Sequence, residues 1–339
     1  MKAVVWLGPR QMELQDVPPP APGKGEVLVR VGAVGICGSE LSGYLGQNSL
    51  RVPPLIMGHE FAGEVAALGE GVARVRVSDA VIVNPLVTCG DCALCARGLE
   101  NLCVRRQLIG AHRPGAFAEL VAVPEKNCLP LPASLGMVSG SLAEPLACGM
   151  RAARLGGVAA GSHALVLGAG AIGLMCLAAV RKAGGAVTLA ADVNPGRLAT
   201  ATEWGAQAVC DARIDDPAEV ARRLTDGAGV DVAIDAVGST ATRRAAVKAV
   251  RAGGMVVLIG LHEAESPLET NYVVRSEIHV TGSFAYIHAD FEGAVSLLAA
   301  GKVQPAAAWL DERSLAACAG AFAQLPDAPP AVAKIVLRP

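Results

Sequence analysis

Hydrophobic and polar positions change rhythm near residue 150 of this 339-residue chain. In residues 1–150 the apolar runs are short and are bounded by Gly, Asp and Pro. The run Val-Leu-Val-Arg-Val at 27–31 alternates as a half-buried strand does. Runs at 64–68 and 80–83 fit the same pattern. We therefore predict a β-rich lobe of short strands, joined by turns and curled into a barrel.

After residue 150, apolar segments of strand length alternate with longer helical segments. The predicted strands cover 164–167, 187–191, 208–210, 232–235, 256–259 and 278–282. The predicted helices cover 171–183, 197–204, 218–225 and 241–250. This alternation predicts an α/β domain with a doubly wound parallel sheet over 151–289. A helical segment at about 290–300 and a strand-like run at 334–337 lead us to expect that 290–339 return to the first lobe, 1–150.

Charge and aromatic content narrow the range of partners. The net charge is −2, from 29 Lys and Arg against 31 Asp and Glu, and no basic block stands out. Aromatic residues make up only 3% of the chain, so platforms for stacking bases are not expected. We therefore expect a small-molecule substrate, with no nucleic acid and no membrane surface as partner.

Four cysteines within fifteen residues form the most distinctive motif. Cys89, Cys92, Cys95 and Cys103 have the spacing C-x2-C-x2-C-x7-C. Four thiolates at this spacing can surround one tetrahedral zinc ion, which favours a structural site with a closed ligand shell. A pair of disulfides and an iron–sulfur cluster are the alternatives, although the proline-flanked run of four-iron ferredoxins is absent.

The remaining cysteines and the first residues of the chain indicate a reducing compartment. The other six cysteines are scattered in mostly apolar surroundings and do not form a secreted disulfide framework. The first residues enter a strand-like run at once and do not resemble a signal peptide. Residues 155–180 lack charge and are long enough to span a bilayer, but their six glycines divide them into strand, turn and helix. We therefore expect a cytoplasmic protein.

A glycine motif follows the first predicted strand of the α/β domain. Gly168, Gly170 and Gly173 form G-x-G-x-x-G between a hydrophobic strand and a helix, the context in which this pattern binds a dinucleotide pyrophosphate. Asp192 ends the next strand, where an acid can accept hydrogen bonds from the adenosine ribose and repel a 2′-phosphate. The alternative for Asp192 is a helix cap or turn residue. Arg197 could pair with a phosphate or lie beside the adenine, and on balance we favour NAD over NADP.

Metal-ligating residue types also occur in three separated segments of the first lobe. Cys37, His59, Glu60 and Glu144 together offer a ligand set that suits zinc. Taken singly, Cys37 fits a core thiol, His59 a buried histidine and Glu144 an acid in the first turn of a helix. Spacing alone does not show that the four converge.

These motifs occur in an order that resembles the zinc-dependent medium-chain dehydrogenases over the whole chain. The matching segments are G-I-C-G-S at 35–39, G-H-E-F-A-G at 58–63, the four-cysteine loop, E-P-L at 144–146, G-A-G-A-I-G at 168–173, Asp192 with Arg197, and Gly253-Gly254 before the strand that leads to Gly260. The polyol branch, with sorbitol and galactitol-phosphate dehydrogenases, is the one resembled, because liver-type alcohol dehydrogenases carry cysteine at the position of Glu144.

The resemblance implies a GroES-like catalytic domain, a Rossmann domain, NAD and two zinc ions per chain. It implies a catalytic zinc on Cys37 and His59, with Glu60 and Glu144 completing the shell directly or through water. It implies that Ser39 hands on the substrate proton as hydride passes from a secondary alcohol to NAD, giving a ketone. The implied NAD contacts besides the glycines are Ile172, Asp192, Arg197, Ile259, Gly260, Leu261, Ser283, Phe284 and Ala285. Tyr286 falls where polyol dehydrogenases place a tyrosine near the substrate.

Several positions depart from the family pattern. Ser42 stands where many relatives have a relay histidine, and Glu40 stands where they have aspartate. Ala285 replaces an arginine of sorbitol dehydrogenases, and Tyr44 lies next to the position of their substrate tyrosine. The proton route and the substrate pocket therefore differ from those of a standard sorbitol enzyme.

Other functions remain to be weighed against this one. A zinc-bearing redox sensor would keep the fold without activity, and a quinone reductase of the same superfamily would lack both metal sets. L-Threonine 3-dehydrogenase and 2,3-butanediol-type dehydrogenases share the layout. The resemblance also implies a homodimer or homotetramer formed through sheet edges of the cofactor domain.

Overall fold

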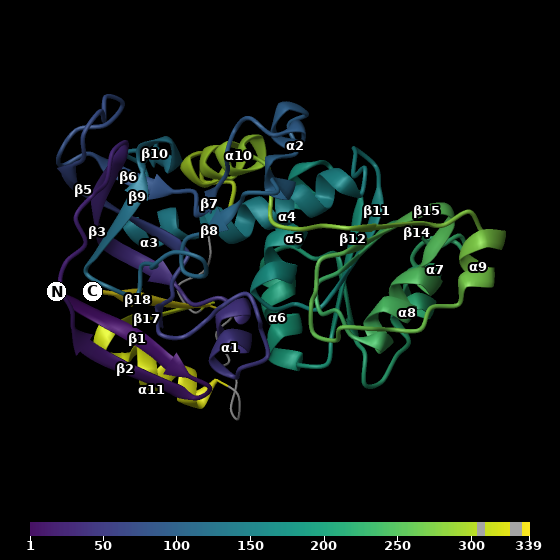
Figure 1. Ribbon diagram of the computed structural model, residues 1–339. Coiled ribbons are helices and arrows are strands. Elements are labelled where there is room, and N and C mark those ends of the chain that lie inside the picture. The colour runs from purple at the N-terminus through teal and green to yellow at the C-terminus, as the bar shows by residue number, and fades with distance from the viewer. Residues whose placement is uncertain (304–308, 326–333) are drawn as a thin grey trace. The chain divides into compact units, whose positions relative to one another are not determined.

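The computed structural model describes residues 1–303, 309–325 and 334–339 (Figure 1). The described chain divides into two compact units, Met1–Glu144 with Val295–Pro339, and Pro145–Ala294. It passes between them inside two helices, α4 (Ala143–Leu155) and α10 (His288–Ala299). The boundaries expected from the sequence, near 150 and 290, fall inside the same two helices.

The first unit contains a three-stranded and a seven-stranded sheet. The small sheet has the order β2-β1-β4, from β1 (Lys2–Gly8), β2 (Gln11–Asp16) and β4 (Leu55–Ile56). The large sheet has the order β10-β6-β5-β3-β18-β17, with β9 beside β3. Its strands are β3 (Glu26–Gly35), β5 (Glu60–Leu68), β6 (Ala80–Val83), β9 (Leu120–Pro124), β10 (Cys128–Pro130), β17 (Leu310–Ser314) and β18 (Lys334–Arg338).

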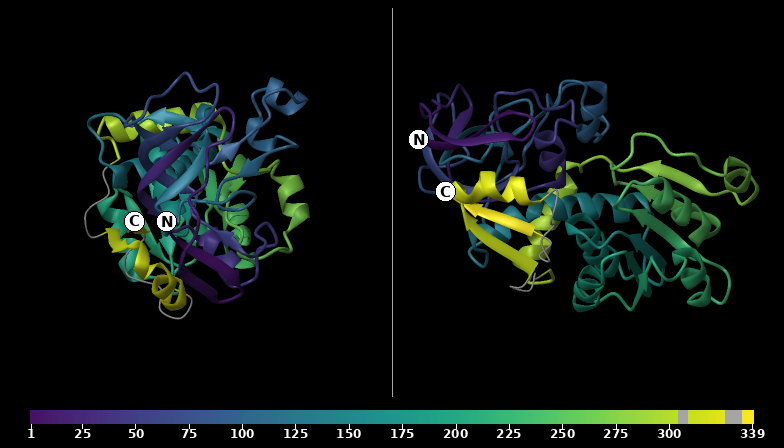
Figure 2. Two further views of the ribbon diagram at one scale, coloured as in Figure 1. Left: turned by 60° about the vertical axis from the view of Figure 1, so that its left-hand side comes forward. Right: turned by 90° about the horizontal axis from the view of Figure 1, so that it is seen from below.

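The last strand brings the end of the chain into this sheet. Strand β18 pairs with β3 through Val336 and Gly35, and runs parallel to β17, as the yellow strands in the right view of Figure 2 show. The side chain of Lys334, the first residue of β18, is thereby placed within the first unit.

The core of the first unit follows the alternation seen in the sequence. Val27, Val29 and Val31 on β3 are buried, as their spacing predicts. Aromatic rings fill the interior, and Phe117 packs edge-on against Phe322 with ring centroids 5.8 Å apart. Burying each such side chain stabilises the fold by about 1.5–3 kcal/mol.

Short elements connect these strands. Helix α1 (Gly38–Tyr44) follows β3, and the hairpin strands β7 (Leu86–Val87) and β8 (Gln107–Leu108) flank α2 (Ala93–Ala96) and the 3-10 turn η1 (Glu100–Leu102). The other helices of this unit are α3 (Met137–Ser141), α11 (Cys318–Gln324) and the 3-10 turns η2 (Glu125–Asn127) and η4 (Leu315–Ala317).

The second unit is a six-stranded sheet in which every neighbouring pair is parallel. Its order is β13-β12-β11-β14-β15-β16, which is the Rossmann order of two mononucleotide-binding halves. The strands are β11 (His163–Leu167), β12 (Val187–Asp192), β13 (Ala208–Asp211), β14 (Val230–Asp235), β15 (Val250–Leu258) and β16 (His279–Gly282). The predicted α/β fold with a doubly wound sheet is confirmed.

Helices cover both faces of this sheet. Leu165 and Leu167 of β11 face a core that includes α7 (Pro217–Arg223) and α8 (Thr240–Ala249). Ala164 and Val166 face the opposite core, with α4 and α5 (Ala171–Lys182). The remaining helices are α6 (Pro195–Glu203) and α9 (Thr270–Arg275).

One strand of the second unit begins earlier than the sequence predicted. Strand β15 begins at Val250, six residues before the predicted start at 256. The sequence did not predict this first part because it is exposed and carries Arg251 and Gly253 rather than an apolar pattern.

None of the helices in the described ranges is long and apolar enough to cross a membrane.

Candidate metal centres and dinucleotide site

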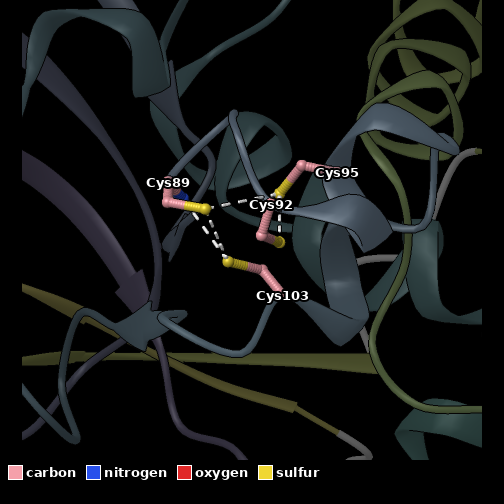
Figure 3. A group of neighbouring side chains, drawn as sticks. All are labelled: Cys89, Cys92, Cys95 and Cys103. Carbon is pink, nitrogen blue, oxygen red and sulfur yellow. Dashed lines mark hydrogen bonds between the residues drawn. The ribbon is translucent and has the colours of Figure 1, made fainter.

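The four cysteines of the 89–103 loop converge on one point. Cys89 follows β7, Cys92 and Cys95 lie at the start and in the body of α2, and Cys103 follows η1 (Figure 3). The sulfur atoms of Cys89 and Cys95 are 3.8 Å apart, those of Cys92 and Cys95 3.6 Å, and those of Cys103 and Cys89 3.3 Å. Four Zn–S bonds of about 2.3 Å in a tetrahedron separate the sulfurs by about 3.8 Å. The geometry therefore fits zinc, and all four cysteines are free thiols.

Backbone N–H groups support thiolate character in this loop. Cys103 Sγ accepts from the N–H groups of Cys89 at 3.5 Å and Arg105 at 3.4 Å. The backbone N–H of Cys95 contributes most to lowering the pKa of Cys92 to about 6, while burial and the neighbouring cysteines raise the pKa of Cys95 to about 12. Because zinc binds the thiolate form, these donors favour metal binding.

Three of the four separated ligand candidates come together in the first unit. Cys37 caps α1 after β3, and His59 and Glu60 lie at the start of β5. One ligand atom from each of Cys37, His59 and Glu60 lies within 4.8 Å of the other two. The β3–β5 register, which pairs Gly35 with Glu60, brings these distant segments together.

Glu40 fixes the arrangement of this ligand set. Its carboxylate is fully buried and accepts from the backbone N–H groups of Cys37 at 3.0 Å and Gly58 at 2.8 Å. Its Oε1 also lies 2.7 Å from Nδ1 of His59. An Nδ1–H that donates to Glu40 leaves Nε2 of His59 available to a metal ion.

The charges in this cluster are strongly coupled. Burial alone would raise the pKa of Glu40, but His59, Arg51 and the N–H of Cys37 outweigh it and hold that pKa below its usual value. Burial would lower the pKa of His59, but Glu40 and Cys37 raise it well above its usual value. Zinc uptake therefore competes with a proton on His59, so binding strengthens as the pH rises.

Glu60 has a cationic partner that the sequence gave no means of finding. Its Oε2 forms a buried ion pair with Nζ of Lys334, the first residue of β18. The pair crosses Gly35, where a Cβ would lie only 2.3 Å from Glu60 Oε2 and 2.9 Å from Lys334 Cε. Glycine at 35 is thus needed for the close approach of the two side chains.

Glu144 lies outside the group formed by Cys37, His59 and Glu60. It is 8% exposed in the first turn of α4 and is close enough to help raise the pKa of Lys334, for which Glu60 and Cys37 are the larger causes against burial. Its place in the zinc shell, directly or through water, stays a prediction.

The hydroxyl residues near this centre have distinct settings. Ser39 Oγ lies 3.4 Å from Cys37 Sγ, which places the predicted relay hydroxyl beside a ligand. Ser42 Oγ donates to the carbonyl of Gly38 at 3.2 Å, within its own helix. Ser42 therefore does not continue a relay from Ser39.

The two predicted substrate tyrosines are both buried. Tyr44 is 5% exposed, packs against Phe322 and donates its hydroxyl to the carbonyl of Arg10 at 3.2 Å. These contacts place Tyr44 in the hydrophobic core of the first unit, and its role at the substrate stays a prediction. Tyr286 is 1% exposed and lies beside Phe291 with ring centroids 5.5 Å apart. Its contact with substrate stays a prediction.

In the second unit, the glycine motif forms the turn between β11 and α5. Gly168 has φ +90°, which favours glycine. A Cβ on Gly173 would lie 1.7 Å from the carbonyl oxygen of Gly168, so the first and third glycines are needed by the fold itself. A Cβ on Gly170 would meet nothing within 4 Å. Gly170 therefore leaves open space at the N-terminus of α5, where a pyrophosphate can accept backbone N–H bonds.

Asp192 links this turn to the next helix. Its Oδ2 accepts from the N–H of Ala169 at 2.7 Å and its Oδ1 from the N–H of Asn194 at 2.8 Å. Asn194, not Asp192, caps α6. Asp192 therefore acts in part as a turn residue, which was the alternative interpretation of this position. Its two carboxylate oxygens still have lone pairs that can accept from ribose hydroxyls. Arg197 Nη1 lies 3.9 Å from Asp192 Oδ2.

The other predicted cofactor residues lie at the carboxyl ends of the same parallel strands. Such ends form the ligand crevice of an open α/β sheet. Ile172 is in the first turn of α5. The residues after β15 are Ile259, Gly260 and Leu261, and those after β16 are Ser283, Phe284 and Ala285. Leu261 is 85% exposed and Phe284 42% exposed.

A substitution at Glu40 tests its hold on His59. We expect Glu40→Gln to weaken zinc binding at the Cys37 site by about 10-fold to 100-fold, because a neutral amide orients His59 less strongly. The four-cysteine site should keep its zinc. Zinc content measured during chelator competition reports both sites. Glu125→Gln is the matched control, since Glu125 also accepts backbone N–H bonds in this unit, from Ala73 at 2.7 Å and from Arg74. Equal zinc loss in both variants would contradict the assignment.

Replacing Gly173 and Gly170 with alanine, one at a time, separates the glycine needed for folding from the glycine needed for cofactor binding. Gly173→Ala should destabilise the second unit by about 1–3 kcal/mol, because its Cβ meets backbone. Gly170→Ala should change stability by less than about 0.5 kcal/mol but weaken NAD binding, because the Cβ enters the open cradle. Thermal unfolding and NAD titration by fluorescence measure the two effects. A Gly170→Ala variant that binds NAD normally would refute the cradle.

Comparisons with known proteins agree with this geometry. Residues 23–133 match the alcohol dehydrogenase GroES-like domain, and residues 171–300 match the zinc-binding dehydrogenase domain. The chain is 35% identical to sorbitol dehydrogenase from Bacillus subtilis, over 93% of this chain and 90% of that protein.

Two solved structures resemble the whole chain. A zinc-binding dehydrogenase from Sinorhizobium meliloti 1021, bound to NADP, has 32% identity and a TM-score of 0.93, covering 100% of this chain and 99% of its own. Galactitol-1-phosphate dehydrogenase from Escherichia coli has 26% identity and a TM-score of 0.93, covering 100% of both chains. With two metal-ligand sets and a dinucleotide turn in place, the protein belongs to the zinc-binding dehydrogenases of the alcohol dehydrogenase family.

Proposed function

We propose that the protein is a zinc-dependent polyol dehydrogenase, which moves hydride between a secondary alcohol and NAD and gives a ketone. The observation that carries this proposal is the convergence of Cys37, His59 and Glu60, with His59 oriented by Glu40. Similarity to a sorbitol dehydrogenase and a galactitol-1-phosphate dehydrogenase supports a polyol or sugar-alcohol substrate.

The two ligand sets are suited to different tasks. Four thiolates close a tetrahedral shell, so Cys89, Cys92, Cys95 and Cys103 would hold a structural zinc. Cys37 and His59, with a carboxylate, leave a position open to substrate. Zinc bound there would supply Lewis-acid polarisation of the alcohol oxygen, and NAD would accept the hydride.

The charge of the open ligand set depends on Lys334. Lys334 offsets the negative charge of Glu60, so the Cys37 thiolate is the main anionic contribution to the site. A site with fewer anionic ligands leaves more positive charge to stabilise an ionised alcohol. Glu144, close to Lys334, would complete the shell directly or through water.

Ser39 would hand on the substrate proton. Its hydroxyl lies beside Cys37, while Ser42 is engaged with the carbonyl of Gly38. Since no histidine stands at 42, the proton would leave Ser39 to water or to the cofactor ribose.

NAD is the proposed cofactor rather than NADP. The Asp192 carboxylate, at the end of β12, would repel a 2′-phosphate and accept bonds from ribose hydroxyls. Arg197 lies close enough to Asp192 to offset part of that repulsion. Comparing the KM values for NAD and NADP tests this preference.

A screen of NAD reduction tests the function. The substrates are polyols, sugar phosphates, 2,3-butanediol and threonine, which also separate a polyol dehydrogenase from the threonine and butanediol alternatives. Metal analysis accompanies the screen, because two zinc ions per chain support a dehydrogenase and none would support a quinone reductase.

Replacing the cysteine ligand tests the catalytic site directly. We expect Cys37→Ser to lower the turnover rate by about 100-fold or more, because the alcohol oxygen loses its polarising site. NAD binding should change little. Cys128→Ala is the control, since Cys128 is a buried thiol of the first unit outside both ligand sets and burial raises its pKa to about 12. Near-native turnover by Cys37→Ser would show that the ligand assignment is wrong.

We also propose that the protein acts in the cytoplasm as a homodimer or homotetramer. Strand β16 is an edge of the parallel sheet, and an edge presents N–H and C=O groups to a second copy. Val280 on this edge is 40% exposed.

Matched substitutions on the two sheet edges test this assembly. Val280→Lys should lower the mass measured by light scattering, because lysine on an edge opposes strand pairing. Val209→Lys is the control, since Val209 lies on the opposite edge strand, β13, and is 41% exposed. Equal masses for the unchanged protein and Val280→Lys would contradict pairing through β16.

A further inference from the structure

Arg51 is a buried cation beside the proposed relay hydroxyl. It is 3% exposed and lies in the first unit, just before β4. Its Nη1 donates to the carbonyl of Ser39 at 3.0 Å and its Nη2 to Ser39 Oγ at 3.3 Å. Its Nε donates to the carbonyl of Gly110 at 3.2 Å. The three acceptors of the Arg51 side chain are neutral, and the charge of Arg51 is offset in part by the buried Glu40 carboxylate, whose pKa Arg51 helps to lower.

Two of the three side-chain hydrogen bonds from Arg51 are accepted by one residue, Ser39. Ser39 Oγ accepts from Arg51 Nη2 and donates its own proton to Cys37 Sγ at 3.4 Å. A hydroxyl has one proton and two lone pairs, so one lone pair remains to accept the substrate proton, and the proton that Ser39 passes on is the one it shares with Cys37 Sγ. Those are the two groups that a hydroxyl relay needs.

Arginine cannot itself serve as the next proton acceptor. Its guanidinium stays charged and has no acceptor atom. Its effect on proton transfer must therefore act through the orientation of Ser39. The other serine of α1, Ser42, donates its hydroxyl to the carbonyl of Gly38 in its own helix.

The third bond connects Ser39 to the histidine ligand. The carbonyl of Gly110 accepts from Arg51, and a Cβ on Gly110 would lie 2.8 Å from the carbonyl oxygen of Gly58. Gly58 immediately precedes His59, and its N–H donates to Glu40. Arg51 thus ties the start of α1 to the loop that carries His59.

We propose that Arg51 is a positioning residue for proton transfer, which holds the Ser39 hydroxyl in the rotamer that receives the substrate proton. This inference rests on the proposed dehydrogenase function. In this protein, Arg51 fixes the orientation of the Ser39 hydroxyl. Relatives with a histidine at the position of Ser42 have a protein base there instead.

Crystal structures provide a test that does not depend on activity. The zinc-loaded protein and its Arg51→Met variant are compared without substrate. We expect Ser39 Oγ in one rotamer, beside Cys37 Sγ, in the unchanged protein, and in other or several rotamers in Arg51→Met. An unchanged Ser39 rotamer in Arg51→Met would overturn the proposal.

A double-mutant cycle tests the consequence for turnover. With Ser39 present, Arg51→Met should lower kcat by about 10-fold to 100-fold with little change in KM for NAD. In a Ser39→Ala background the same substitution should lower kcat by less than about 2-fold, because the hydroxyl it acts on is gone. Equal losses in the two backgrounds would show a general structural effect and overturn the proposal.

Two further variants guard against misfolding. Arg113→Met is the control for loss of a partly buried arginine, since Arg113 pairs with Glu26 in the same unit, and it should keep kcat. Where Arg51→Met does not fold, Arg51→Lys takes its place in the crystal structure and the cycle, and the same outcomes decide. If the unchanged protein oxidises no alcohol, the proposed function is refuted. The Ser39 rotamer in the crystal structures then decides by itself whether Arg51 positions Ser39.

Discussion

A single buried carboxylate organises the reactive part of this protein. Glu40 accepts from the N–H groups of Cys37 and Gly58 and from Nδ1 of His59, so one side chain holds the segments that follow β3 and precede β5. A carboxylate is stable in this dry position because N–H groups donate to it and the charges of His59 and Arg51 favour its ionised form. The metal ligands, the relay serine and the Arg51 contact are all arranged around this point.

The two metal centres differ in how the chain builds them. The four-cysteine loop is local, since all its ligands lie between 89 and 103 and its sulfurs converge with the help of short turns and backbone N–H groups. The Cys37 centre is assembled from separate strands, and β18 completes it with Lys334 opposite Glu60. The local site therefore keeps its shape independently, whereas the reactive site depends on correct pairing of β3, β5 and β18.

Much of this arrangement could be predicted from the sequence, and the exceptions have a common cause. The alternating strands and helices of the doubly wound sheet, the glycine turn and the cysteine loop depend on local patterns, and the structure has them where the sequence indicated. Lys334 and Arg51 gave no signal, because their partners lie far away in the sequence. Glu40 was noted only as a departure from aspartate, although its position three residues after Cys37 is a capping-box signal. The burial of Tyr44 was not visible in the sequence, because neighbourhood in sequence does not reveal which face of a short helix is buried.

The central claim is that one chain holds two zinc ions with different ligand shells. Anomalous diffraction at the zinc edge, measured on crystals of the zinc-loaded protein, tests it most directly. We expect two peaks per chain, one about 2.3 Å from the sulfurs of Cys89, Cys92, Cys95 and Cys103, and one bound by Cys37 and His59. A single peak at the four cysteines, with His59 donating to Glu40 but free of metal in fully loaded protein, would contradict it.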